Sequence, residues 1–524
     1  MKQRKHVMLV VGLLAMLLAF GPLVGCGTQP ANDKQADESA ETEMTKEDDF
    51  DDATTTSSTY ERAWQPRDGY TLKRVVAMSR HNLRAPQQKD MDTLTASTPH
   101  EWVKWSSNGS ELTVKGGVAE TIMGEFFRKW LESEQLIPEN YIPAEGEVRF
   151  YANPRQRTLA TTQFFSSGML PVANARIEYH GEYDSRDPVF KPRFDFVSDA
   201  YTKAATDQIA TQDDNLALAD IDKDLQGSYD LITKVLDYKN SQAYQSGDAK
   251  DLETGDTTYQ IAIDEEPSLT GSLKDANKLS DALSLQYFEA NDLTEAAFGT
   301  ELSQDEWKQI VAAKNAYGDR RYNSKLVSVN CAHLLVSEIA KELGTDGRRF
   351  SFLCGHDSNQ SSLLHALGVT DYTLPDTIET KTPIGGKILF EVYENASGEQ
   401  FCNIRYVYAT SDQVRNLSIL SLEQAPASFD LDFEGLARNA DGLFALADVQ
   451  QLLADTVAAY DQLAVDYPAD AAAQGEEAAT GPTVEADPTT DDTIDLDADS
   501  KTGDVIEFDA EPKADDAIEL DQAA

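Results

Sequence analysis

The amino-acid sequence predicts an α/β domain that is interrupted by a mostly helical insertion. Two patterns in residues 61–467 lead to this fold class. Short apolar runs, which predict buried strands, lead into polar turns and then into segments with the 3.6-residue period of an amphipathic helix. Residues 181–325 differ, because they contain amphipathic helical runs and loops rich in Asp and Gly but no convincing strand. We therefore expect an α/β domain in two parts, 61–180 and 326–467, with a helical insert domain at 181–325.

The predicted elements alternate along both parts of the α/β domain. The first part should contain a strand at 75–78, a helix at 118–131, a strand at 148–152 and a helical run that ends near residue 168. The insertion should contain helices at 216–238 and 273–288. The second part should contain a helix, a strand, a second helix and two further strands, at 326–343, 350–354, 358–367, 387–393 and 404–408.

The first 26 residues have the pattern of a secretory signal. Three basic residues precede an apolar run from residue 7 to residue 20, which is too short to span a bilayer comfortably. The run closes on Leu23-Val24-Gly25-Cys26, which resembles the lipobox of bacterial lipoproteins. This resemblance implies that Cys26 is lipidated and that the mature protein is extracytoplasmic, tethered by lipid to the cell membrane of a bacterium. An ordinary signal peptide with an incidental cysteine is the alternative.

Two acidic segments flank the α/β domain. Residues 27–60 carry ten acidic and two basic residues, and residues 468–524 carry eighteen and two. Their composition predicts a disordered, self-repelling linker and a similar tail. Three units of the tail, at 492–497, 504–509 and 516–521, repeat at a spacing of twelve residues and alternate apolar with acidic side chains. The repeats indicate either a solvated tail or a docking or cation-binding motif.

The net charge of the chain indicates which classes of partner it can bind. A formal net charge of −46 excludes nucleic acid, because such binding depends on basic surface that neutralises phosphates. A phosphate ester can still bind in a pocket, since exposed charges are screened beyond roughly 8 Å at physiological salt. A lipid on Cys26 would be the only link to a membrane.

The cysteines and histidines predict neither a metal site nor a cofactor. Cys331, Cys354 and Cys402 have no CxxC spacing, and their odd number allows at most one disulfide. The seven histidines show no spacing such as HExxH. We therefore expect chemistry that uses side chains alone.

The first polar turn carries a histidine between two arginines. Apolar residues 75–78 lead directly into Arg80, His81 and Arg84, and Pro86 prevents simple continuation of the strand. Ligands of α/β sheets collect at the carboxyl ends of the strands. Two fixed guanidinium groups suit the multidentate recognition of an oxyanion. The turn therefore predicts a phosphate site.

A second polar turn, Gly355-His356-Asp357, also follows an apolar strand and precedes a helix. A helix amino terminus favours anions. The alternative is that Asp357 only caps the helix and that His356 is a loop histidine. Both turns place histidine and charged residues at strand ends of one predicted sheet, which favours a shared site.

The two turns resemble the signatures of a known family. Residues 79–86, SRHNLRAP, resemble the RHGxRxP motif of the histidine acid phosphatases, branch 2 of the histidine phosphatase superfamily, and residues 355–357 resemble their HD motif. Gln156-Arg157-Thr158 is similar to the segment that brings a third phosphate-binding arginine. Asn82 replaces the usual glycine, as in the periplasmic glucose-1-phosphatases of enteric bacteria. The resemblance covers about residues 66–455 and implies a phosphoglycerate-mutase-like α/β core.

The resemblance also implies roles for single residues. His81 would be the nucleophile that forms a phosphohistidine, and Asp357 would protonate the leaving alcohol. The phosphoryl oxygens would be held by the basic groups Arg80, Arg84, Arg157 and His356. A dianionic phosphate nearby would raise the pKa of Asp357 so that it can act as an acid.

The substrate is predicted to be a small phosphate monoester. Glu266, in Asp264-Glu265-Glu266-Pro267, matches a glutamate that contacts the sugar in glucose-1-phosphatases, although an acidic surface loop is the alternative. Such a carboxylate would disfavour highly charged ligands and favour glucose 1-phosphate. The alternatives are an inositol-phosphate (phytate) phosphatase, a broad acid phosphatase, or a non-catalytic lipoprotein that binds phosphorylated ligands.

Overall fold

The computed structural model describes residue 60, residues 63–211 and residues 220–468. The predicted signal with Cys26, nearly all of the predicted linker, and the tail repeats therefore lie outside the described residues. Within the described part, no helix is both long and apolar enough to cross a membrane.

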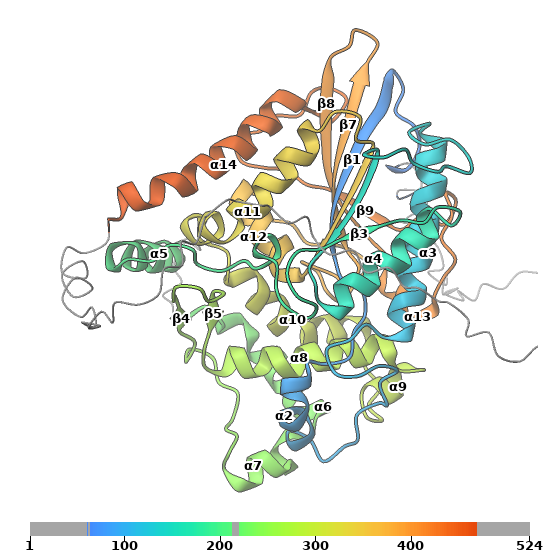
Figure 1. Cartoon of the computed structure of the whole chain (residues 1–524). Helices are drawn as coiled ribbons and strands as arrows, with labels where there is room; N and C mark the ends of the chain where they lie inside the picture. Colours follow the sequence, from blue (N-terminus) through green and yellow to red (C-terminus); the bar gives the residue numbers. More distant parts are fainter. Residues whose placement is uncertain (1–59, 61–62, 212–219, 469–524) are drawn as a thin grey trace, which may run out of the picture. The chain divides into compact units, whose positions relative to one another are not determined.

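A mixed eight-stranded sheet forms the centre of the α/β region (Figure 1). The strands follow the order β10-β8-β7-β1-β6-β2-β3, and β9 pairs with β8. The sheet is parallel from β1 through β6 and β2 to β3, and antiparallel from β1 through β7 and β8 to β9 and β10. The strands are β1 (Tyr70–Arg80), β2 (Val148–Ala152), β3 (Ile177–Glu178), β6 (Phe350–Gly355), β7 (Lys387–Asn395), β8 (Gln400–Tyr408), β9 (Ala427–Asp430) and β10 (Phe444–Ala445).

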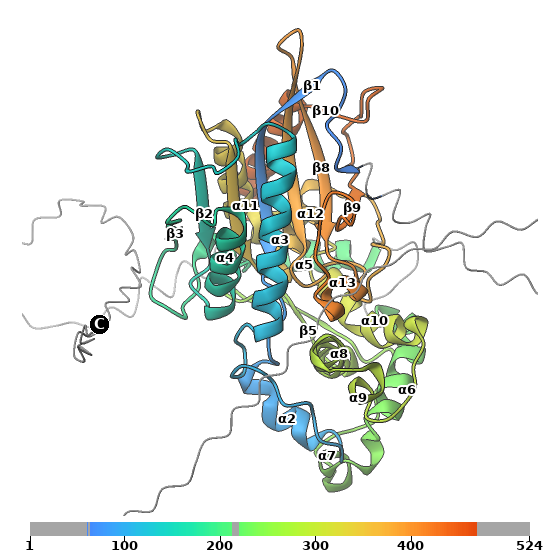
Figure 2. The ribbon, with the colours of Figure 1, turned by 90° about the vertical axis from the view of Figure 1, so that its right-hand side faces the viewer.

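Helices cover both faces of this sheet (Figures 1 and 2). One face packs against α3 (Val114–Ser133) and α4 (Gln156–Met169), and the other against α11 (Lys325–Gly344), α12 (Asp357–Leu367) and α14 (Leu446–Asp466). Side chains alternate along a strand. Val75 and Ala77 therefore pack in the core between the sheet and α3 and α4, and Val76 and Met78 pack in the core on the opposite face. Burial on both faces explains why residues 75–78 of β1 form a continuous apolar run, whereas its first residues, 70–74, are partly exposed and mostly polar.

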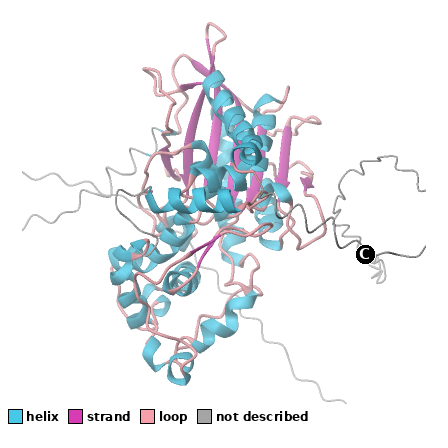
Figure 3. Ribbon diagram, turned by 90° about the vertical axis from the view of Figure 1, so that its left-hand side faces the viewer, coloured by secondary structure: helices cyan, strands magenta, loops and turns pink. Residues whose placement is uncertain are grey.

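The predicted helical insertion contains helices and one short hairpin. Figure 3 shows these helices gathered beyond one end of the strands. The elements are α5 (Asp199–Thr211), α6 (Gln226–Val235), α7 (Gln242–Ser246), β4 (Tyr259–Gln260), β5 (Ser268–Leu269), α8 (Ser272–Glu289), α9 (Leu293–Ala296) and α10 (Gln304–Arg320). The β4–β5 hairpin was not predicted, because two-residue strands leave no periodic pattern.

The helical core also takes residues from outside the predicted insertion. Leu94 of α2 (Met91–Ala96) and Val414 of α13 (Ser411–Asn416) belong to the same buried cluster as α6, α8 and α10. The α/β fold class is confirmed, whereas the boundaries at 180/181 and 325/326 stay a prediction.

Candidate active site

The two polar turns meet because β1 and β6 are adjacent parallel strands. Their register pairs Arg80 with Gly355, so both strands end at the same edge of the sheet. The His81 backbone N–H donates to the Gly355 carbonyl at 3.0 Å. The His81 and His356 rings lie 5.5 Å apart between centroids and meet at 70°. One edge of the sheet therefore holds both histidines.

The His81 imidazole is buried and has a defined hydrogen bond. Its Nδ1 lies 2.8 Å from the Asn82 carbonyl oxygen, which can only accept, so Nδ1 carries the proton. The neutral ring then has a free electron pair on Nε2. Burial, followed by the charges of Arg157 and Arg80, lowers the pKa of His81 well below its ordinary value. His81 therefore presents a neutral, nucleophilic nitrogen in acidic solution.

The second histidine, His356, has the same tautomer, with its proton on Nδ1. The Asn153 side-chain oxygen accepts from the Asp187 backbone N–H at 3.0 Å, which directs the Asn153 Nδ2 to His356 Nε2 at 2.6 Å. His356 Nε2 must accept, so Nδ1 carries the proton and lies 3.4 Å from an Arg157 nitrogen. Burial and then Arg157 lower the pKa of His356 well below its ordinary value. Neutral His356 thus offers an N–H donor beside a guanidinium group.

Three arginines, Arg80, Arg84 and Arg157, lie near His81. Arg80 is fully buried, Arg84 is 5% exposed, and Arg157 is partly buried. The Nε of both Arg80 and Arg157 is buried without a hydrogen-bond partner. Burial and then Arg84 lower the pKa of Arg157 to about 9, so Arg157 remains charged in acid. Donors that lack a protein partner suit a bound oxyanion.

This positive charge is balanced by carboxylates that the sequence alone did not point to. Arg80 donates to Glu379 Oε1 at 3.1 Å, and Arg84 donates to Asp281 Oδ2 at 2.9 Å. Lys314 lies between these carboxylates, bonded to Glu379 and 2.9 Å from Asp281 Oδ1. Asp281 and Lys314 belong to α8 and α10, where isolated charges in amphipathic helices resemble solvated surface residues.

Asp357 is the first residue of α12 rather than its cap. The N-cap is His356, whose backbone N–H donates to the Asn359 side chain at 2.9 Å, so the capping alternative does not describe Asp357. The Asp357 side chain is 37% exposed, and its Oδ2 lies 3.6 Å from Arg80 Nη2. Burial raises the pKa of Asp357, but Arg80 and then Lys314 outweigh burial and hold it well below its usual range. In the ligand-free site Asp357 is a carboxylate.

Glu266 lies between two arginines that the sequence did not single out. Its carboxylate forms an ion pair with Arg186 and lies 3.7 Å from Arg321 Nη1. The charge of Arg186 contributes to the low pKa of His356, and the charge of Arg321 contributes to that of Asp357. Glu266 is therefore linked through its arginines to the histidine site.

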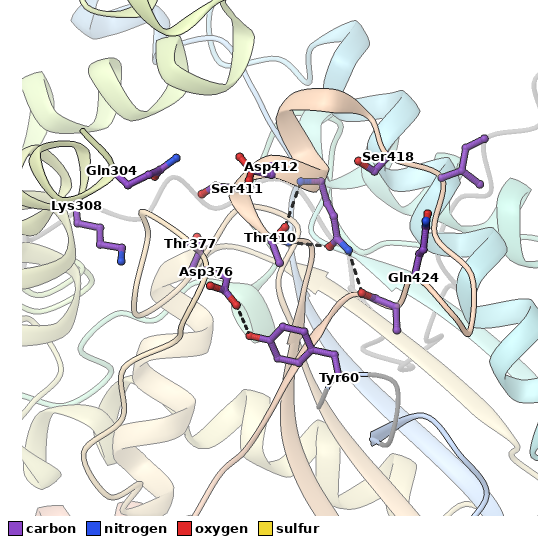
Figure 4. Close-up of a pocket in the computed structure, with 13 residues that line it drawn as sticks. Tyr60, Gln304, Lys308, Asp376, Thr377, Thr410, Ser411, Asp412, Ser418 and Gln424 are labelled. Atoms are coloured by element: carbon purple, nitrogen blue, oxygen red, sulfur yellow. Dashed lines mark hydrogen bonds between the residues drawn. The ribbon is translucent and has the colours of Figure 1, made fainter. Parts of the chain in front are cut away.

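Other features of the described residues lie outside this site. Cys331, Cys354 and Cys402 are buried free thiols, which answers the open question of a disulfide. The described part contains no cluster of His, Cys, Asp and Glu that could hold a metal ion. A cavity of about 570 Å³ lies beside α13, where Tyr60 donates to Asp376 at 2.7 Å (Figure 4). That cavity shares no residue with the predicted site.

Known proteins resemble the chain over the region that carries the site. A family model described as histidine phosphatase superfamily (branch 2) matches residues 71–409. The chain is 35% identical over 379 residues to a glucose-1-phosphatase of Salmonella typhimurium, covering 72% of this chain and 90% of the relative. It is 26% identical over 400 residues to a phytase of Escherichia coli, covering 73% and 91%. The structure of Hafnia alvei phytase in complex with tartrate matches with a TM-score of 0.68 and 25% identity, covering 75% of this chain and 98% of that chain.

We expect both histidines to remain neutral as the pH falls from about 7 to about 5, because burial and the guanidinium charges oppose a second proton. The NMR signals of their Cε1–H groups, assigned with His81→Ala and His356→Ala, should not titrate in this range. In urea-unfolded protein the same groups should titrate near pH 6.5, roughly the unperturbed value. A midpoint near 6.5 for His81 or His356 in the folded protein would contradict this electrostatic account.

Proposed function

Because this chain belongs to branch 2 of the histidine phosphatase superfamily and is a phosphatase, we propose that it hydrolyses glucose 1-phosphate or a similar small phosphate monoester through a phosphohistidine at His81. One observation carries this mechanism. The buried, neutral His81, with Nε2 unprotonated, lies against His356 and among arginines with unpaired donors, and one of these arginines, Arg80, lies 3.6 Å from the Asp357 carboxylate. Family membership favours an enzyme over a non-catalytic lipoprotein.

The first step is attack on phosphorus. Arg80, Arg84 and Arg157 hold the phosphoryl oxygens, and the Nδ1–H of His356 donates to one of them. His81 Nε2 forms a bond to phosphorus as the bond from phosphorus to the ester oxygen breaks. Asp357 gives its proton to that oxygen, so the product leaves as a neutral alcohol rather than an alkoxide.

The second step returns the enzyme to its starting state. Asp357, now a carboxylate, takes a proton from a water molecule while the water oxygen attacks phosphorus. The bond from phosphorus to His81 Nε2 breaks, inorganic phosphate leaves, and Asp357 then releases its proton, because the surrounding cations lower its pKa again once the anion has gone. Each displacement uses the same arginines, because negative charge develops on the same phosphoryl oxygens.

The charge of the substrate prepares Asp357 for the first step. In the ligand-free site the surrounding cations keep the pKa of Asp357 low. A phosphate that binds the arginines offsets their positive charge and adds negative charge beside the carboxylate. Both changes favour the protonated acid. Substrate binding and proton uptake by Asp357 are therefore coupled.

Glu266 supports a preference for a singly phosphorylated sugar. Its negative charge already neutralises Arg186 and Arg321 in part, so these arginines are less available to a second phosphate. A carboxylate oxygen at this position also accepts hydrogen bonds from sugar hydroxyls. The second candidate function is that of an inositol-phosphate phosphatase, because a phytase is among the relatives of this chain. A broad acid phosphatase remains the third.

We place this activity outside the cytoplasm, attached to the cell membrane through a lipid on Cys26. The support is the signal-like pattern of residues 1–26, which ends in a lipobox-like sequence. The attachment would involve the lipid alone, and the acidic linker would separate the catalytic domain from the membrane surface.

His81→Ala should reduce turnover of glucose 1-phosphate by at least about 10⁴-fold, because the bond to phosphorus cannot form. Acid-sensitive phosphoprotein trapped from labelled substrate should disappear in the same variant. His100→Ala, at a histidine stacked on Phe298, is the matched control and should keep both signals. Turnover by His81→Ala near the wild-type rate would show that another group attacks.

Asp357→Asn should slow hydrolysis of glucose 1-phosphate by about 10²–10⁴-fold but that of an activated aryl phosphate far less, because only the alkoxide needs a proton. The measurement is kcat for both substrates on both proteins. An equal loss on the two substrates would remove the role of Asp357 as the acid.

Glu266→Gln should raise kcat/KM for phytate relative to glucose 1-phosphate by about tenfold, roughly 1.4 kcal/mol, because Arg186 and Arg321 lose their carboxylate partner. Glu265→Gln, at the exposed neighbour in the same loop, is the matched control and should leave the ratio unchanged. An unchanged ratio in Glu266→Gln would mean that Glu266 does not set specificity.

A further inference from the structure

We propose that a buried triad, formed by Asn82, Glu120 and Lys387, positions the His81 imidazole so that Nε2 faces the substrate. The triad residues touch neither substrate nor phosphorus, so they are positioning residues. The inference rests on the proposed function, because it assigns a reason for the tautomer that the phosphohistidine mechanism requires. In the family motif the residue after the histidine is usually glycine, whereas in this chain it is Asn82.

The Asn82 side chain and backbone are held at three points. Its Nδ2 donates to Glu120 Oε2 at 2.7 Å, and its Oδ1 accepts from the Leu83 backbone N–H at 2.8 Å. Its backbone N–H donates to the Thr161 hydroxyl at 3.1 Å. The remaining backbone group, the carbonyl, accepts from His81 Nδ1. Fixing residue 82 on all sides therefore fixes the acceptor that selects the His81 tautomer.

Lys387 completes the triad from the opposite side. Its Nζ lies 2.8 Å from Glu120 Oε1, and both side chains are fully buried. The Lys387 ammonium also lies 5.4 Å from the centroid of Phe165 and 5.7 Å from that of Phe352. Removal of either charge would leave the other uncompensated in the core, which is strongly destabilising, so the two side chains stay paired.

The triad also reaches His81 through Gly385. Lys387 Nζ donates to the Gly385 carbonyl at 2.7 Å, and the Gly385 N–H donates to the His81 carbonyl at 3.1 Å. Gly385 has φ +63°, and a Cβ there would lie 2.4 Å from Asn82 Nδ2. The backbone carbonyl of His81 and the Nδ1 of its ring are thus both held by groups that contact the triad.

The three triad residues come from three different segments of the α/β region. Glu120 lies on α3 and Lys387 begins β7, while Asn82 follows β1. The arginines that face the anion use other partners, Glu379 and Asp281. Loosening the triad should therefore disturb the nucleophile and leave phosphate binding nearly intact.

The test uses Asn82→Ala, which removes the hydrogen bond to Glu120 without unpairing a buried charge. A double variant, Glu120→Gln with Lys387→Met, removes the ion pair as a unit. We expect kcat for glucose 1-phosphate to fall by about ten- to a hundredfold in each. KM and the inhibition constant of inorganic phosphate should change less than about twofold. The imidazole ¹⁵N signals of His81, in histidine-labelled protein, should show loss of the pure Nδ1–H form.

The matched control is Glu391→Gln with Arg405→Met. This pair is also buried, at 2.6 Å on β7 and β8, and its guanidinium packs 4.0 Å from Trp64. It should lose thermal stability but keep kcat per active site. If Asn82→Ala keeps the wild-type kcat and the Nδ1–H signal, the positioning role is wrong, whether or not the double variant folds. Failure of the wild-type enzyme to form phosphohistidine would instead overturn the proposed function.

Discussion

The rest of the site depends on one constraint, which is that several positively charged side chains are buried together around the two histidines. Arg80 and Arg84 point into the same site as Arg157, and burial removes much of the water that would solvate them. The charges are tolerated because Glu379 and Asp281 pair with two of them and Lys314 links these carboxylates. The carboxylates neutralise only part of the positive charge, and an anionic phosphate would complete the balance.

The same electric field sets the protonation states that the chemistry needs. This field adds to burial, the larger cause, in disfavouring a proton on His81 and His356, so both imidazoles stay neutral in acid. It also keeps Asp357 ionised until an anion arrives. In the proposed mechanism, a site with these properties is ready for attack by nitrogen but lacks its acid until substrate binds. That mechanism ties hydrolysis to the presence of the phosphate group rather than to the solution pH alone.

The two parts of the fold divide this work. The sheet brings the histidines together through the register of β1 and β6, and α3 and β7 contribute Glu120 and Lys387, which pair beside Asn82, the residue that follows His81. Helices α8 and α10 supply the counter-charges, and the loop between β4 and β5 supplies Glu266. In the proposed mechanism, the residues that react lie on the α/β layers, whereas the residues that balance charge and set substrate preference lie in the helical region, where divergence in sequence is tolerated more easily.

The sequence by itself determined the five longest strands, the two polar turns and the residues at their ends, because apolar runs that lead into charged turns are local patterns. It predicted that Arg80, His81, Arg84, His356 and Asp357 would share one edge of a sheet, and the register of β1 with β6 brings both turns to that edge. Only the tertiary structure decided which groups surround them. Asn153, Glu379, Lys314, Asp281 and the arginine partners of Glu266 come from separate elements. Their contacts depend on how helices pack against the sheet, and no local pattern of residues records that packing.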